Sequence, residues 1–571
     1  MKRLSAIFLS GLVCACFLPV PLPAREKTDG YVSASIESSH HFYVRDAANG
    51  FIPAEDIVQL QNGGAYAANN YLKVDYYRGC LSVGGQVEGY FPSMAGYPVA
   101  ESMLSLSNLY AGWTDESWSV LAGTFYEQLG SGLLFRSWED RPLGLNNAVL
   151  GARATYKYRD ILSVRVFGGV PRMGKISDNA FKTGDGKIPV FAFGFTDVAV
   201  AAADIALSVS ECAGWEKLSW SVEGSALYRH EDISDYLAAS GFRAHNIGWS
   251  VRTGIDAGGF YFRGEHVSAG VQDYLATFPR KANAQLVELG YNEGGLGISL
   301  SARRIYSMNS KIYTSNSLGF VELDTDYNPS VNVLSYCPAL CAQHTYMLAN
   351  LTPYMPRTDG EAGGQLDVFY NFRRGTVMGG KRGMRVHANI SAYFSLNDDG
   401  GFKGGQRRMW DVTFDVEKQW TKKFKTTLLY SVQEHNRYEA GLVSVAGAVV
   451  ENELLVGCSH AVVADMLYKW TSKFSTRLEL QYLAAEGYMK DWMAALLEVS
   501  FTPHWSVFGS DMYNHGESGM HYYNAGVSYA MRHLRVAAGY GRYRGGYICS
   551  GGVCRPVPSY TGANLTITAS F

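Results

Sequence analysis

Short runs in which apolar and polar side chains alternate recur along nearly the whole chain. In Trp410–Glu417 the even positions are apolar and the odd positions are polar, and Lys217–Ala226 follows the same rule with the odd positions polar. Successive side chains of a β-strand point to opposite faces, so each run predicts a strand with one apolar and one polar face. The alternation therefore predicts an all-β protein.

The runs define a series of predicted strands that fills the chain from Tyr31 to its last residue. They cover residues 31–44, 68–79, 80–91, 104–113, 117–126, 148–158, 161–170, 196–209, 217–230, 245–256, 260–269, 283–292, 295–305, 361–373, 384–396, 408–419, 424–435, 451–469, 474–487, 491–501, 505–513, 520–531, 533–543 and 559–571.

The junctions between these strands alternate in length. Short junctions such as Ala257–Gly259 and Arg532–His533 alternate with long ones such as 45–67, 127–147 and 306–360. Short turns at one rim and long loops at the other are typical of outer-membrane barrels, whose closure leaves no unpaired strand edge in lipid. The sequence predicts a large antiparallel transmembrane β-barrel of about 24 strands (22–26), with short periplasmic turns and long extracellular loops.

The start of the chain has the pattern of a signal peptide, which we place at residues 1–24. Lys2 and Arg3 precede an apolar stretch, and Ala24 is small enough for the last residue before cleavage. A lipid-attachment signal at Cys14 or Cys16 is the less favoured interpretation. No linker divides residues 25–571, so we expect one barrel domain in the bacterial outer membrane, in contact with outer-membrane lipid, lipopolysaccharide and the barrel-assembly machinery.

Composition excludes other classes. Beyond the signal peptide no uncharged apolar run is long enough for a membrane-spanning helix. A net charge of −2 gives no reason to expect nucleic acid as a partner. Phe571 ends a strand whose apolar face also carries Leu565 and Ile567, and a terminal aromatic of this kind resembles the assembly signal of outer-membrane barrels.

The stretch Phe125–Tyr156 interrupts the alternation with charges placed among glycines and large apolar residues. Four of its side chains, at Arg136, Glu139, Asp140 and Arg141, have two interpretations. In the first, the loop 127–147 folds inward and they form a charged constriction that screens small solutes. In the second, they pair with neighbours and brace the loop in shape.

The sequence GTFYEQLGSGLLFRSWEDRPLGLNNAVLGARATY resembles the signature of a family of Bacteroidota outer-membrane β-barrels of unknown function. Gly294–Met308, Tyr336–Tyr346 and Leu351–Tyr354 also match it. The resemblance implies the same fold and an outer-membrane location. It implies no activity, because the family has none assigned.

Two pairs of cysteines stand close in sequence. Cys337 and Cys341 are expected to form a local disulfide, because a secreted chain meets an oxidising compartment. A metal site with His344 is the less favoured alternative, since the spacing matches no common zinc pattern. Cys549 and Cys554 are expected to form a second disulfide. No metal or cofactor is expected, and at least one of the remaining thiols is free.

No arrangement of residues predicts catalysis, so we expect a protein that is not an enzyme. Gly375–Lys381 nearly makes a phosphate-binding loop, but Arg382 stands where Ser or Thr is required, so we interpret it as a turn. The leading hypothesis is a channel or transport pore for small solutes, constricted by the loop 127–147. The alternative is a non-conducting protein that binds a surface protein or a glycan, or assists envelope assembly, through its outer loops.

Overall fold

The computed structural model describes residues 30–57, 60, 64–97, 102–172, 195–196, 198–233, 235–272, 279–310, 312, 333–397, 399–402, 405–436, 456–486 and 490–571. Within them, antiparallel strands form one closed sheet of 24 strands, as the sequence predicts. Each strand pairs with its neighbour in the chain, and β1 closes the ring by pairing with β30. The expected signal peptide, residues 1–24, lies outside the described residues.

The strands of the ring are β1 (Tyr31–Tyr43), β2 (Tyr66–Arg78), β3 (Leu81–Tyr90), β4 (Met103–Thr114), β5 (Trp118–Phe125), β10 (Val149–Tyr158), β11 (Leu162–Pro171), β12 (Ala199–Ser208), β13 (Leu218–His230), β14 (His245–Ala257), β15 (Phe260–Val271), β16 (Lys281–Glu293), β17 (Leu296–Tyr306), β18 (Gly360–Phe372), β19 (Met384–Ser395), β20 (Arg407–Gln419), β21 (Phe424–Asn436), β22 (Val456–Lys469), β23 (Phe474–Ala485), β24 (Trp492–Phe501), β25 (Trp505–Asn514), β26 (Met520–Met531), β27 (Leu534–Tyr543) and β30 (Tyr560–Ser570).

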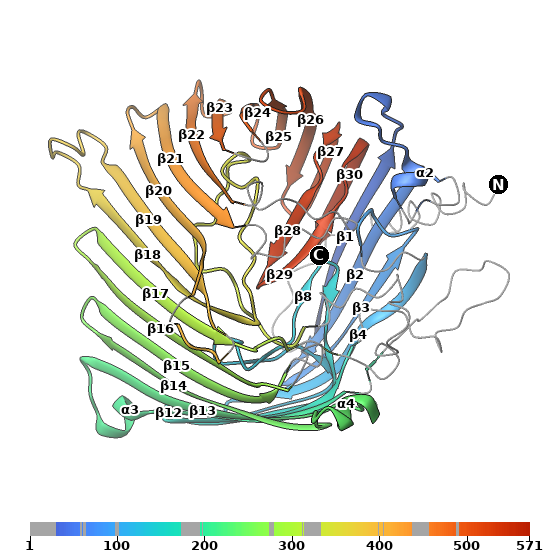
Figure 1. The fold of residues 1–571 in the computed structure, drawn as a ribbon, viewed down its shortest axis with the longest axis vertical. Helices are drawn as coiled ribbons and strands as arrows, with labels where there is room; N and C mark the ends of the chain where they lie inside the picture. The colour runs from blue at the N-terminus through green and yellow to red at the C-terminus, as the bar shows by residue number, and fades with distance from the viewer. Residues whose placement is uncertain are drawn as a thin grey trace.

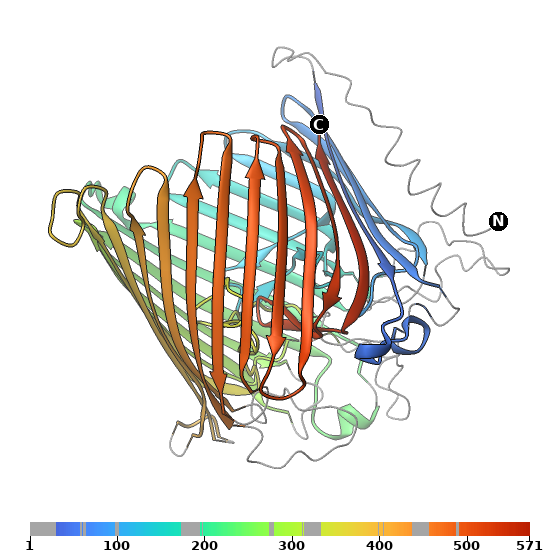
Figure 2. The ribbon, with the colours of Figure 1, turned by 90° about the horizontal axis from the view of Figure 1, so that it is seen from above.

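Short turns join the strands at one rim of the barrel and longer segments join them at the other (Figure 2). We call these the short-turn rim and the long-loop rim. Tyr31 and Phe571 lie together at the short-turn rim, where Phe571 exchanges two backbone hydrogen bonds with Ala34, of 2.8 and 3.1 Å. The order of short and long junctions is therefore the one that the sequence predicts.

Helix is scarce among the described residues and occurs only as short turns between strands. These are η1 (Ala47–Asn49), α2 (Pro53–Asp56), α3 (Val209–Ala213) and α4 (Asp235–Ala239). No helix found there is long and apolar enough to cross a membrane.

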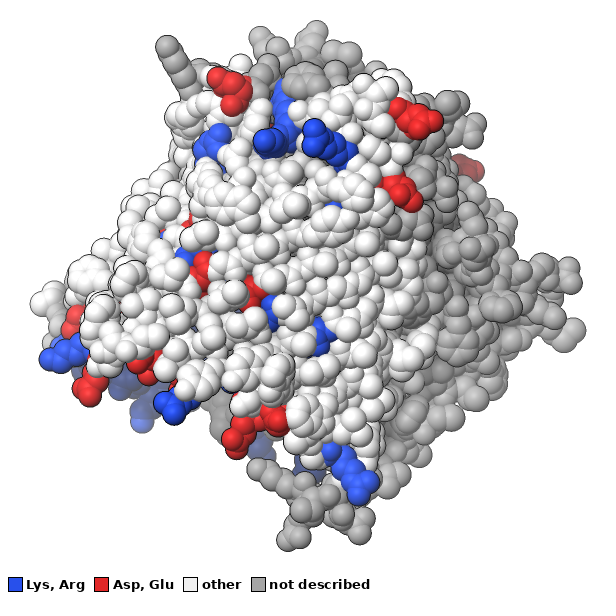
Figure 3. Space-filling model, turned by 90° about the horizontal axis from the view of Figure 1, so that it is seen from below, with Lys and Arg blue, Asp and Glu red and all other residues white. Residues whose placement is uncertain are grey.

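The outward face of the barrel is apolar. Large hydrophobic side chains occupy outward strand positions and are exposed, among them Val74, Leu109, Val166, Ile205, Val251, Phe414, Val462 and Leu497. On the face shown in Figure 3, uncharged atoms cover most of the wall, and most Lys, Arg, Asp and Glu side chains gather near its edges. Such a surface is stable in a lipid environment and costly in water.

Aromatic rings follow both edges of this apolar face. Near the short-turn rim, outward rings pair at centroid distances of 4.5 to 6.2 Å, as in Trp118–Tyr156, Phe260–Tyr291, Phe424–Tyr468 and Trp505–Tyr529. Near the long-loop rim, tyrosines stack on histidines, as in Tyr228–His245, Tyr430–His460 and Tyr513–His521. Rings with an apolar body and a polar edge are favoured at the boundary between lipid and water.

Candidate functional site: an internal plug

Three segments from the long-loop rim lie inside the ring of strands (Figure 1). They are residues 126–148 between β5 and β10, residues 333–359 before β18, and residues 544–559 between β27 and β30. We call them together the plug. The first two segments pack on inward side chains of the wall, and the three segments contact one another, so the plug is a continuous packed structure.

The segment 126–148 folds as two small hairpins. β6 (Gln128–Leu129) pairs with β7 (Phe135–Arg136), and β8 (Glu139–Asp140) pairs with β9 (Leu145–Asn146). Gly130 stands in the first turn with φ of 55°, and a Cβ there would lie 2.4 Å from Glu265 Oε1. The left-handed backbone conformation favours glycine at this position, and its lack of a side chain leaves room for the side chains of Glu265 and Arg252.

Hydrophobic packing seats the first hairpin on the wall. Leu129, Leu133, Leu134 and Phe135 are at most 2% exposed. They belong to one cluster with inward residues of the neighbouring strands, namely Phe167, Val200, Ala202, Leu227, Val267, Ala269, Ala282, Ala284 and Ile305. Many of these wall residues are small, which leaves the space that the hairpin fills. The cluster is a core inside the barrel, comparable to that of a soluble domain.

Charged groups anchor the start of the same segment. Glu127, whose side chain is 4% exposed, receives ion pairs from Arg153 at 2.6 Å and from Arg165 at 2.9 Å. Arg165 also pairs with Asp204 at 2.9 Å, and Asp204 continues the network to Arg252 at 2.6 Å. A buried carboxylate is tolerated when it is paired and hydrogen-bonded in this way, and removing one partner is costly.

The second hairpin reaches a different part of the ring, at β1 to β3. Arg141 pairs with Glu37 on β1 at 2.7 Å and donates to Gln86 on β3 at 3.0 Å, while its guanidinium lies 4.4 Å from the ring centre of Tyr71 on β2. Burial opposes the charge of Arg141, but Glu139 and Glu37 outweigh it and raise its pKa above the usual value. The side chain is thus held as a cation by the wall.

The other three predicted residues also contact protein groups. Arg136 lies 3.8 Å above the ring centre of Tyr336 and 5.3 Å from that of Trp138. Glu139 accepts a hydrogen bond of 2.6 Å from Gln86, and Asp140 accepts one of 3.1 Å from the backbone of Leu143.

The four predicted residues thus lie in one hairpin pair, where Arg141 and Glu139 also pair with each other at 3.5 Å. Arg136 packs on the neighbouring plug segment, whereas Glu139 and Arg141 contact the wall.

The segment 333–359 covers the wall on the other side of the interior. Its Leu348, Ala349 and Leu351 form a cluster with inward residues of β21 to β24. Polar contacts fix its path, with His344 at 2.7 Å from Asp411 and the backbone of Leu348 donating to Gln481 at 2.9 Å. This segment is therefore seated in the same manner as the first.

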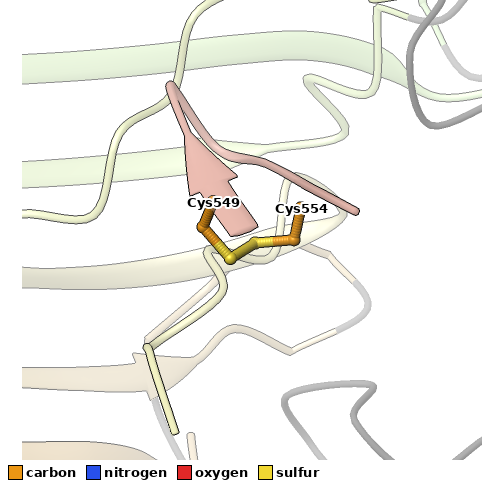
Figure 4. The surroundings of a disulfide bond; sticks show 2 residues. All are labelled: Cys549 and Cys554. Atoms are coloured by element: carbon orange, nitrogen blue, oxygen red, sulfur yellow. A yellow bond between two sulfur atoms is a disulfide. The ribbon is translucent and has the colours of Figure 1, made fainter. Parts of the chain in front are cut away.

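The third segment is a hairpin of β28 (Gly546–Ser550) and β29 (Val553–Val557) closed by a disulfide between Cys549 and Cys554 (Figure 4). Both cysteines stand directly opposite each other in the pairing register. The hairpin joins the other two segments, since Gly551 accepts a hydrogen bond of 2.9 Å from the backbone of Cys337 and Arg555 donates one of 2.8 Å to the carbonyl of Pro142.

The expected disulfide between Cys337 and Cys341 does not form in this structure, where both cysteines are free and buried. The reason is packing, because Cys337 joins the cluster of Leu334 and Phe135 whereas Cys341 packs against Tyr354 and Tyr393. Burial raises the pKa of the Cys337 thiol to about 11 and that of Cys341 to about 12.

No group of His, Cys, Asp and Glu side chains within the described ranges has the arrangement of a metal site. His344, the residue that the sequence offered as a metal ligand, contacts Asp411 and Gln433.

A cavity of about 610 Å³ lies between the second and third plug segments and the strands β20 and β21. Its lining combines neutral polar and aromatic side chains with apolar ones such as Pro338, Pro353 and Met409, and it has one carboxylate, Asp411, which His344 contacts. The residues that line it include Tyr336, Gln343, His344, Asn350, Tyr354, Asp411, Gln433, His435, Tyr547 and Cys554. Its volume lies within the range of small-molecule sites in proteins.

The segment 127–147 could be identified in the sequence, but the residues that anchor it to the wall could not. In the sequence, Glu127 is one of several acidic residues in a loop. In the structure, it is the most buried of the ion-pairing groups in that segment. A signal was present in the residues 198–203, where both faces of the predicted strand are apolar or small. An inward face without polar residues indicates that another part of the chain packs on it.

Comparisons with known proteins give no activity. No curated protein matches the chain. Among solved structures, the siderophore receptor PirA from Pseudomonas aeruginosa is similar at 9% identity and a TM-score of 0.41, over 96% of this chain and 81% of that one.

Two further solved structures resemble the chain. The P pilus usher PapC translocation pore is similar at 8% identity and a TM-score of 0.43, over 95% and 99% of the two chains. The outer membrane protein opdK from Pseudomonas aeruginosa is similar at 11% identity and a TM-score of 0.34, over 80% and 99%. Likenesses this distant do not indicate what the chain binds or transports. A model of a family of unknown function, DUF6029, matches residues 1–571, and the chain belongs to this family.

Proposed function

We propose that the chain is an outer-membrane transport pore for small solutes, narrowed by its own inward-folded plug, and that it is not an enzyme. The membrane location is supported by the closed ring of strands, by the exposed apolar outward face and by the aromatic rings at both of its edges. In this location the long-loop rim faces outward and the short-turn rim faces the periplasm.

The observation that carries the transport proposal is the cavity inside the plug. A plug that served only to seal the barrel would gain stability from complete packing, because every void forfeits contacts. The cavity of about 610 Å³ instead keeps polar groups such as Asn350, Gln433 and Asp411 at its lining. We propose that solutes pass through or are held in this space.

Within this proposal, the loop 127–147 narrows the pore as a fixed wall. Arg141 and Glu139 brace it against β1 and β3, and Arg136 braces it against Tyr336. We therefore propose that the cavity between residues 333–359 and the hairpin β28–β29 selects the solutes, because its lining side chains face an open space.

The test is single-channel recording in planar lipid bilayers. The variant replaces Ile548–Arg555, the end of the β28–β29 hairpin, with a short Gly-Ser linker, because this hairpin contributes no strand to the ring. Wild-type protein is expected to conduct, and the variant to conduct more. The matched control places the same kind of linker at Asp235–Ala239, where α4 lies outside the plug, and is expected to conduct as the wild type does.

The alternative function is a non-conducting protein that binds a surface protein or a glycan through its outer segments or assists envelope assembly. The observation in its favour is the hydrophobic packing of two plug segments on two different parts of the wall. If wild type and hairpin variant are both folded, as judged by their strand content in circular dichroism, and neither conducts, the transport proposal fails. Crosslinking in intact envelopes would then be expected to recover one defined partner.

A further inference from the structure

The turn between β18 and β19 is the most basic feature of the short-turn rim. From Arg373 to Arg385 the chain carries five cations, Arg373, Arg374, Lys381, Arg382 and Arg385, and no acid. The turn is longer than its neighbours on this rim, and its tip is exposed, with Val377 fully exposed. It also contains the Gly375–Lys381 stretch, which forms part of the turn.

A shallow cavity of about 520 Å³ lies at the foot of this turn. Four arginines line it: Arg373, Arg374, Arg382 and Arg385. Within the described ranges none of the four forms an ion pair. The only acid in the lining is Glu417, and Lys425 already pairs with it at 2.9 Å. The cavity is therefore a concentration of uncompensated positive charge.

The turn is ordered by its own hydrogen bonds. Thr376 donates to the carbonyl of Arg373 at 2.8 Å and accepts from the backbone of Gly379 at 3.0 Å, while Gly375 donates to Gly380 at 2.7 Å. These backbone N–H groups are occupied, so the stretch does not bind phosphate in the manner of a phosphate-binding loop. An anion in this cavity would therefore bind to the guanidinium groups of the arginines.

The cavity faces the mouth of the lumen. Arg385 and Glu417 are paired across β19 and β20 in the same register as His387 and Asp415, which contact each other inside the barrel at 2.5 Å. Arg385 is held in place by the ring of Phe369, whose centre lies 4.9 Å from its guanidinium. Gly295, which has φ of 93°, allows the neighbouring turn to approach the backbone of Asn371.

We propose that this cavity binds a phosphate-bearing anion at the short-turn mouth of the barrel. Guanidinium groups form planar, bidentate hydrogen bonds to phosphate, and several arginines without acidic partners repel one another until an anion joins them. The phosphate comes from a free solute or from a lipid headgroup at the membrane surface. The site is independent of the plug and stands whether or not the barrel conducts.

Native mass spectrometry of the full-length protein in detergent tests the site. One arm titrates pyrophosphate and the other titrates phosphatidylglycerol, with phosphatidylcholine as the zwitterionic reference. The test variant is R374Q/R382Q. The matched control is R159Q/R532Q, which removes the same charge from two other turns of the same rim that do not line the cavity.

Wild type and control are expected to bind one of the two anions equally well, and the test variant at least about tenfold more weakly, because two bidentate contacts are lost. Binding of pyrophosphate assigns a free solute, and binding of phosphatidylglycerol without pyrophosphate assigns a headgroup. Equal binding by both variants, or no binding of either probe by wild type, overturns the proposal. Unchanged strand content in circular dichroism shows that a loss of binding is not a loss of folding.

Discussion

The two halves of the barrel interior are built from the same strands but carry different inward side chains. In the half nearer the long-loop rim, Ala202, Val267 and Ala284 point inward and are almost completely buried under the plug. In the half nearer the short-turn rim, inward positions hold groups such as Arg263 and Asp256, an ion pair at 2.7 Å whose side chains are 44% and 47% exposed. One half is a packed core and the other faces water.

This difference shows that the alternation of apolar and polar residues identifies the outward face of each strand reliably, but not the inward face. The outward residues stay apolar along the whole strand because their surroundings do not change. The inward residues follow whatever lies against them, which is water in one half and folded chain in the other. A barrel strand can therefore lose its alternation where a plug begins, without ceasing to be a strand.

The largest expected effect is the loss of Phe135, which is fully buried in the plugged half. We expect Phe135→Ala to destabilise the seating of the hairpin by about 3 to 5 kcal/mol, because it removes a large side chain and leaves a cavity. Hydrogen exchange measured by mass spectrometry should show amides of Gln128–Arg136 exchanging faster by two orders of magnitude or more.

The same substitution in the other half is the control. Phe369 is an inward, partly exposed residue of β18, and Phe369→Ala should leave exchange in the plug unchanged. If both variants alter plug exchange to the same degree, the division of the interior into a packed and a water-facing half is wrong.

The next largest effect is expected when the buried carboxylate of Glu127 is removed. Glu127→Gln leaves Arg153 and Arg165 without their shared carboxylate, and we expect a cost of about 2 kcal/mol, moderated because both arginines are about a quarter exposed. Exchange of amides near Gln128 should rise on the order of thirtyfold. Glu288→Gln, at an inward position of β16 in the water-facing half, should have no such effect. Equal responses would mean that Glu127 is not an anchor.

The fold could be predicted almost completely from the sequence, whereas of the plug only the inward folding of residues 127–147 was among the interpretations. The predicted strand 424–435 corresponds to Phe424–Asn436, and 217–230 to Leu218–His230, because a lipid-facing strand must keep its outward residues apolar and leaves that period in the sequence. The seating of residues 333–359 depends on contacts with residues distant in the sequence, such as Gln481. Such contacts leave no periodic pattern in the local sequence.

A smaller effect separates the two interpretations of the arginines. We expect Arg141→Gln to cost about 1 kcal/mol, because it breaks the contacts with Glu37 and Gln86 while its side chain keeps some access to water. Exchange of Glu139 and Asp140 amides should rise about fivefold, and ion selectivity in bilayers should be unchanged. A shift in the reversal potential without faster exchange would favour a constriction over a brace.

The last prediction tests the burial of the plug by thiol labelling, and its cysteine substitutions are expected to change stability least. Cys337 lies in the packed half, where burial raises the pKa of its thiol to about 11 and also blocks access. Cys212 is exposed at the short-turn rim. In the C80S/C341S/C458S background, which leaves the Cys549–Cys554 disulfide intact, maleimide at neutral pH should modify Cys212 within minutes and Cys337 only after urea is added.

A raised thiol pKa means less reactive thiolate at a given pH, so the labelling of Cys337 in the folded protein should be slow at neutral pH and should speed up by about tenfold for each pH unit towards about 11. Adding Phe135→Ala to the same background should expose Cys337 without urea, since both residues share one cluster. If Cys337 stays protected in that variant, the first and second plug segments are seated independently, and the plug is two units instead of one.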